Sequence, residues 1–138
     1  MKRVLSFLSL LLLAAGWLTL AGCSLPIISP ADRAYSLVAG VNAISRDVLA
    51  DNFLPTITDL AKLQDPAQYP TLWETSFPYA NSPYSLTVLS AASPAAVTLT
   101  LQDNKGGAPL NILLVMAQVG NDWFIQRMEM PPGAPLVQ

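Results

Sequence analysis

A change in hydrophobic periodicity near the middle of the chain most constrains its fold. Between residues 31 and 52, apolar side chains recur every three or four positions, which is the spacing of one helix face. This stripe consists of Ala34, Leu37, Val38, Val41, Ile44 and Val48. From Tyr84 onward the period falls to two, as expected for strands with one buried face. Helices followed by strands predict an α+β fold, with a long N-terminal helix packed on a curved antiparallel sheet of three or four strands.

The start of this helix is well marked. Ser29 can cap it, Pro30 fits the first turn, where its missing N–H costs nothing, and Asp32 adds negative charge there. Gly40 lies inside the helix and costs about 1 kcal/mol relative to alanine. Close packing on a sheet is one reason to have glycine at that position.

Shorter elements complete the expected domain. Two short helical segments are expected over residues 55–63 and 71–77. Strands are expected over 84–88, 97–101, 110–119 and 123–130, separated by turns rich in Gly, Asn, Asp and Pro. The segment 110–119 is apolar on both faces, which predicts a central strand. Pro131 and Pro132 end the last strand, so residues 131–138 are expected to form a flexible tail.

The first 22 residues have the pattern of an export signal. Lys2 and Arg3 precede an uncharged, apolar run from Val4 to Leu20. That run is at the lower limit of length for crossing a bilayer, so hydropathy alone also allows an uncleaved membrane anchor. The tetrapeptide Leu20–Cys23 then supplies leucine, two small residues and cysteine.

This arrangement resembles the signal of bacterial lipoproteins. The resemblance implies that the Cys23 thiol is linked to diacylglycerol and that a peptidase cuts between Gly22 and Cys23, whose amino group then takes an acyl chain such as palmitate in many Gram-negative bacteria. Two or more acyl chains make membrane attachment stable. Ser24 resembles the next residue of lipoproteins sorted to the outer membrane. The expected location is therefore the bacterial cell envelope, on the outer membrane facing the periplasm if the cell is Gram-negative.

The resemblance divides the chain into a signal peptide (1–22), a lipidated tether (23–30), an α+β domain (31–130) and the tail (131–138). Over about residues 30–130 the order of elements also resembles the cystatin-like and NTF2-like superfamily, which includes many small bacterial lipoproteins. The predicted closing hairpin, Val119–Ile125, is similar to the Gly-x-x-Trp-x-Ile ending of such domains. The inhibitory Gln-x-Val-x-Gly motif of cystatins is missing, so protease inhibition is not implied.

Composition argues against catalysis, metal binding and nucleic-acid binding. The sequence has no histidine and one cysteine, which removes the commonest general base and the usual nucleophile pairs. Asp47 and Asp51 are the nearest approach to a carboxylate cluster, and calcium needs six or more oxygen ligands. Beyond Gly22, five scattered cations face nine acidic residues, which is unlike a phosphate-binding surface. We therefore expect no enzyme activity, no cofactor, no metal and no nucleic-acid partner.

Two functions stay open. The first is a non-catalytic interaction or scaffolding module, whose sheet face or edge docks to an envelope protein. The alternative is a binder of a small apolar ligand in the concave face of the sheet. Its candidate lining is aromatic, although aromatic residues at helix and strand positions more often form core: Trp73, Tyr79, Tyr84 and Trp123. Three carboxylates show no partner that the sequence identifies: Glu74, Asp103 and Glu129.

Overall fold

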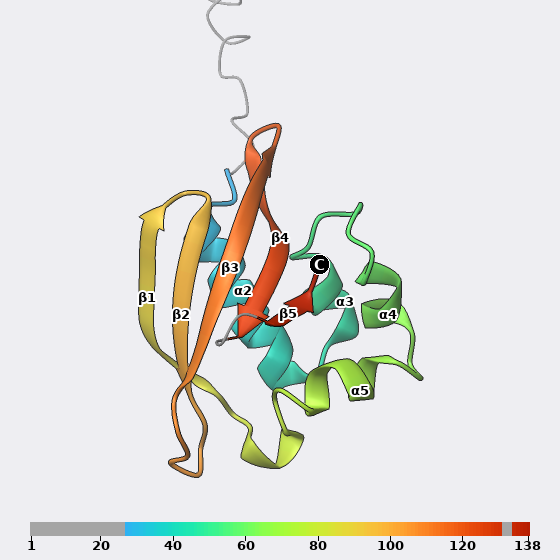
Figure 1. The fold of residues 1–138 in the computed structure, drawn as a ribbon, viewed down its shortest axis with the longest axis vertical. Helices are drawn as coiled ribbons and strands as arrows, with labels where there is room; N and C mark the ends of the chain where they lie inside the picture. The colour runs from blue at the N-terminus through green and yellow to red at the C-terminus, as the bar shows by residue number, and fades with distance from the viewer. Residues whose placement is uncertain (1–26, 131–133) are drawn as a thin grey trace, which may run out of the picture.

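The computed structural model describes residues 27–130 and 134–138 (Figure 1). Within them, one antiparallel sheet has the order β1-β2-β3-β4-β5, and helices precede it. The helices are α2 (Pro30–Ala43), α3 (Arg46–Ala50), α4 (Leu60–Gln64) and α5 (Tyr69–Glu74), with a 3-10 turn, η1 (Tyr79–Asn81). The strands are β1 (Ser85–Ser93), β2 (Ala96–Gln102), β3 (Leu110–Val119), β4 (Asp122–Met130) and β5 (Ala134–Val137). The predicted α+β class is confirmed.

The four long strands form a meander in which the predicted central strand is confirmed. β3 has the expected bounds and lies between β2 and β4. Alternate residues of β3 point into the protein and are buried: Ile112, Leu114 and Met116. Leu113 and Val115 lie between them and are partly exposed on the opposite, outer face. The predicted turns are confirmed, with Gly106 and Gly120 at positive φ.

The N-terminal helix is shorter than predicted, because α2 ends at Ala43 and a separate helix begins three residues later. Ile44 takes the left-handed conformation, with φ 54°, and the Ser45 side chain accepts a hydrogen bond from the Val48 N–H. Ser29, Pro30 and Asp32 start α2 as expected, through a capping box. The apolar stripe therefore continues across a bend, and its last members, Ile44 and Val48, are exposed.

Gly40 has a different role from the one expected. A Cβ atom built on Gly40 would lie 3.0 Å from two side-chain atoms of Leu49 and 3.2 Å from Val48. The glycine therefore permits close approach of α3 to α2, and its close neighbours are helical side chains, not the sheet. This contact fixes the bend that separates the two helices.

The segment after α3 also departs from the prediction. A helix was expected over residues 55–63, but α4 begins only at Leu60. Phe53 forms a parallel bridge with Ile125, and the Leu54 N–H donates to the Ile125 carbonyl at 2.9 Å. After Leu54 the chain leaves β4 through turns, in which the Ile57 N–H donates to the Leu54 carbonyl at 3.1 Å, so residues 55–59 are not helical. The helical turn expected near residues 71–77 is present as α5, starting at Tyr69.

The expected flexible tail instead ends in a fifth strand. β5 pairs with the end of β4, and Val137 is fully buried opposite Met128. Asp59 binds both backbone groups of Gln138, the residue after Val137. The Asp59 N–H donates to the Gln138 carbonyl, and the Asp59 carboxylate accepts from the Gln138 N–H, each at 3.2 Å. β4 ends at Met130, just before Pro131 as predicted, and Pro135 inside β5 is tolerated because β5 is at the sheet edge, where a missing N–H can be accommodated.

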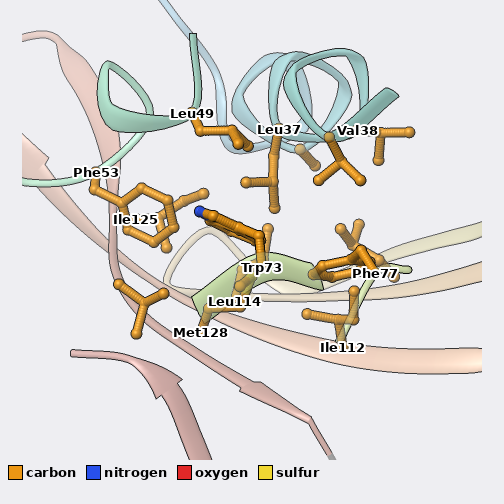
Figure 2. Close-up of a cluster of buried hydrophobic side chains, with 14 of the residues drawn as sticks. Leu37, Val38, Leu49, Phe53, Trp73, Phe77, Ile112, Leu114, Ile125 and Met128 are labelled. Carbon is orange, nitrogen blue, oxygen red and sulfur yellow. The ribbon is translucent and has the colours of Figure 1, made fainter. Parts of the chain in front are cut away.

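The hydrophobic core lies between the inner face of the sheet and the helices, which pack on that face (Figure 1). Figure 2 shows Trp73 at its centre, between helical residues such as Leu37 and strand residues such as Leu114. The ring of Trp73 is 5.5 Å from that of Phe77. The largest fully buried side chains are Trp73, Phe53, Phe77, Leu37, Leu49, Leu63, Leu99, Leu101, Ile112, Leu114, Ile125 and Met128.

The Gly40 contact predicts an unusual response to alanine. In an open helix, Gly40→Ala would stabilise by about 1 kcal/mol. Here the new methyl group meets the buried Leu49 side chain, and overpacking costs about 1–3 kcal/mol. We expect a net loss of about 1 kcal/mol in the free energy of unfolding, measured with urea.

A double-mutant cycle isolates this contact. In a Leu49→Ala background the obstructing side chain is gone, so Gly40→Ala should become stabilising. Stabilisation by Gly40→Ala in both backgrounds would contradict close packing as the reason for the glycine.

Candidate functional site

The predicted lipidation and cleavage residues, Gly22 and Cys23, lie outside the described residues. The described chain begins at Ile27, and its next residue is fixed to the tip of the β3–β4 hairpin. The Trp123 N–H donates to the Ile28 carbonyl, and the Ile28 N–H donates to the Asp122 carboxylate, both at 3.1 Å. The first residue fixed to the domain is therefore five residues after Cys23, which is at most about 18 Å when extended.

The three aromatic candidates for a ligand pocket do not form one site. Trp73 and Tyr84 are buried in the core, where both pack on Phe77. Burial raises the pKa of Tyr84, and its hydroxyl donates to the Pro78 carbonyl at 3.1 Å. Trp123 is half-buried at the opposite end of the sheet, beside Ile28.

The fourth aromatic candidate, Tyr79, lies beside the core and not at a cavity. It is half-buried next to Tyr69, whose pKa is raised to about 12 by burial and by Tyr79 itself. The space between these rings, Trp73 and Phe77 has no volume left for even a water molecule. The inner face of the sheet is therefore filled at the position where a ligand was considered.

A shallow groove of about 350 Å³ lies elsewhere, between the segment after α3 and the bulged part of β4. Thr56, Thr58 and Gln126 are among its lining residues. Arg127 is also in its wall, but its guanidinium is 2.7 Å from the Glu129 carboxylate. The groove therefore presents a neutralised ion pair to solvent and no unbalanced charge from these two residues.

The other carboxylates are dispersed or engaged in local turns. The Asp103 side chain accepts from the backbone N–H groups of Lys105 and Gly107 in the β2–β3 loop. Glu74, Asp47 and Asp51 are exposed. In the part of the chain that the structure describes, no three acidic or cysteine side chains come together as a metal site. Among the same residues, none of the helices has the length and apolar character needed to cross a membrane.

Arg33 is one of three buried polar residues in the described chain, with Asn52 and Asp59, and the sequence did not single it out. It is 8% exposed, and its Nε donates to the Trp123 carbonyl at 2.6 Å, while Nη1 donates to the Asp51 carbonyl at 2.8 Å. Its guanidinium carbon also lies 4.3 Å from the centre of the Phe124 ring. Burial lowers the pKa of Arg33, against the opposing effect of Asp122 and Asp51. Arg33 thus joins α2, the end of α3 and β4.

The outer edge of β4 is covered along most of its length. Near its start the partners are Ile28 and Arg33, described above. At Ile125 the backbone N–H donates to the Asn52 carbonyl at 2.8 Å, and the carbonyl accepts from the Leu54 N–H. From Met128 onward, β5 continues the pairing.

The outer edge of β1 is different. Just before the strand, the Asn42 side chain binds both backbone groups of Tyr84, at 2.8 and 2.7 Å. From Ser85 to Ser93, no described residue pairs with the edge that faces away from β2. In Figure 1 this strand forms the left-hand boundary of the sheet. Val88 is 51% exposed there.

Comparison of the chain with protein-family models, with curated proteins and with solved structures gives no match. A function is therefore argued from the surface of the described residues and from the sequence pattern of the first 23 residues.

The joining role of Arg33 predicts a large loss of stability when its side chain is removed. Arg33→Ala deletes two hydrogen bonds from a charged donor and the contact with Phe124, so we expect unfolding in urea to be easier by about 2–4 kcal/mol. Arg33→Lys keeps the charge but not the planar guanidinium, so its free energy of unfolding should lie between those of the wild type and Arg33→Ala.

Arg46 provides the matched control. Its Nη1 also donates to a backbone carbonyl, that of Gln64 at 3.2 Å, but at the surface. Arg46→Ala should change the free energy of unfolding by less than about 0.5 kcal/mol. Equal effects at Arg33 and Arg46 would contradict the assigned role.

Proposed function

We propose that this chain is a lipid-anchored protein of the bacterial cell envelope, whose domain is a non-catalytic interaction module. The observation that carries the proposal is the tetrapeptide Leu20–Cys23 behind a basic N-terminus and an uncharged apolar run. Each part is where the lipoprotein signal needs it, and lipid on Cys23 accounts for the single cysteine of the chain.

The position at which the chain enters the domain supports a membrane-proximal role. Ile28 is hydrogen-bonded to the β3–β4 hairpin, and a short tether separates it from Cys23. A lipid on Cys23 would keep this hairpin within about 18 Å of the bilayer surface. An outer-membrane location facing the periplasm is proposed from Ser24, for a Gram-negative cell.

The distribution of polar groups favours binding over catalysis. The sequence offers no histidine, and lipid would occupy its one thiol. Asp103 and Glu129 are held by a loop and by Arg127. What the domain offers is surface: the outer face of the sheet, with partly exposed Leu113 and Val115, and the edge of β1.

The alternative, a binder of a small apolar ligand, has no observation in its favour. Two of its three main candidates, Trp73 and Tyr84, are buried core residues. We also propose the cystatin-like or NTF2-like superfamily for the domain, on the order of helices, meander and closing hairpin.

The mass of the membrane-extracted protein tests the anchor. We expect a species that lacks residues 1–22 and carries diacylglycerol and an acyl chain on Cys23. Cys23→Ser should accumulate as the uncut precursor, because the modification precedes cleavage. Ser24→Ala should be processed normally, as a control beside the modified residue. A wild-type species that retains residues 1–22 with a free Cys23 thiol would contradict the proposal.

The interaction module is tested by cross-linking in cells. The anchored wild-type protein should be recovered with a defined envelope protein above background. Recovery of none would remove this half of the proposal and leave the anchor standing.

A further inference from the structure

The outer edges of β4 and β1 differ in how many of their backbone groups have hydrogen-bond partners among the described residues. Along β4, backbone groups are paired by Ile28, Arg33, Asn52 and Leu54, and then by β5. Along β1, pairing by described residues stops at Tyr84, which Asn42 holds on both backbone groups. Unpaired N–H and C=O groups of an edge strand are a template for another strand. The edge of β1 is therefore the position where this sheet can be extended.

β1 also lacks the charged residues that usually protect such an edge. Natural edge strands often carry lysine or other charges that prevent pairing with a second molecule. Between Glu74 and Asp103 the sequence has no charged residue, and β1 and β2 lie wholly within this stretch. Pro83 and Pro94 stand just outside the two ends of β1, not within it.

The side chains of β1 are suited to a further strand. Leu86 and Leu89 point to the inner side, where they are only partly buried against the core. Val88 and Ser90 are exposed on the outer side, paired across the sheet with Thr100 and Thr98. An added strand would cover the exposed flank of the leucines and complete the inner apolar layer.

The strand whose chemistry fits best is β1 itself. Being uncharged, it can approach its own copy without like-charge repulsion. Register shifts occur between Leu86 and Val88 and between Ala91 and Ser93, so the regular stretch of β1 is 88–91. Residues that face each other in antiparallel strands point to the same side of the sheet, so a two-fold axis in this stretch must pass through a residue. A two-fold axis through this stretch makes the strands antiparallel and can set outer residues opposite outer residues, such as Ser90 opposite Ser90 of the copy.

We propose that two copies of this chain associate through their β1 edges, forming one continuous antiparallel sheet across a two-fold axis. The helices of both copies then lie on the same side. The outer faces of the two sheets join into one larger surface, which is where an envelope partner would bind. The pairing of the two β1 strands is argued from the described domain and does not depend on the anchor, whereas the envelope partner rests on the proposed function.

Introduced cysteines test the pairing directly, because Cys23 is the single cysteine of the chain. Ser90→Cys is expected to give a covalent dimer in membranes of producing cells after treatment with a short thiol cross-linker. Thr98→Cys is the matched control: it is exposed on the same face but one strand further from the edge. The wild type, treated in the same way, reports any reaction of Cys23.

A pair of lysine variants tests the same edge without cross-linking. The full-length protein extracted in detergent should be dimeric by mass, with amide exchange in residues 85–93 slowed about tenfold or more relative to a monomer. Val88→Lys should be monomeric with fast exchange in β1, whereas Thr98→Lys should stay dimeric. Slow amide exchange in β3 of both variants would show that each is folded.

Several results would overturn the proposal. A monomeric wild type with fast exchange in β1 would show that the edge is open. Cross-linking from position 90 only to a different protein would assign the edge to that protein's strand. Equal yields of cross-linked dimer from positions 90 and 98 would show that the two copies meet through the outer face of the sheet and not through the β1 edge. Protection of β1 in the Cys23→Ser precursor alone would assign the edge to residues 1–22. None of these results changes the mass expected at Cys23, so the two proposals fail separately.

Discussion

The hydrogen bonds made by the outer backbone groups of β4, from Trp123 to Ile125, are the interactions on which the rest of the fold depends. These groups are paired by residues before α2, within α2 and after α3. A buried N–H or carbonyl without a partner costs about 1–3 kcal/mol, so these bonds fix where the helices can dock. Arg33 acts at the centre of this arrangement, because it binds Trp123 and the end of α3 at once. The sheet thereby holds the end of α3 beside β4, while the Gly40 contact allows the close approach of α3 to α2.

The strands were predictable because alternation of side chains is a direct consequence of strand geometry. β3 has the predicted bounds, and its neighbours follow from the turns around it. The bend at Ile44 was not predictable from period, since Val48 continues the apolar stripe after the chain has changed direction. Arg33 was missed because its partners are backbone carbonyls, which every residue has. β5 was missed because prolines were weighed as strand breakers, although an edge position tolerates them.

The candidate site residues also differ in whether a local sequence pattern or the packing of the fold decides their role. The proposal for Cys23 rests on a short local sequence pattern, so it needs no knowledge of the fold. Trp73 and Tyr84 illustrate the opposite case: the residue type suits a pocket or a core equally, and only packing decides. The exposure of the β1 edge is likewise a property of strand order. The sequence contributes the absence of charge, and the structure contributes the position at the end of the sheet.

The order of elements has a consequence for folding during synthesis, because a chain leaves the ribosome N-terminus first. The helical segments emerge early, and their apolar residues, such as Leu37 and Leu49, have no surface to pack on until the strands follow. Short helices are marginal in water without tertiary packing. Ile125 and Val137, both fully buried, arrive among the last residues of the chain. The core therefore closes only after these residues have emerged, and until then the apolar side chains of the emerging polypeptide are accessible to chaperones and proteases.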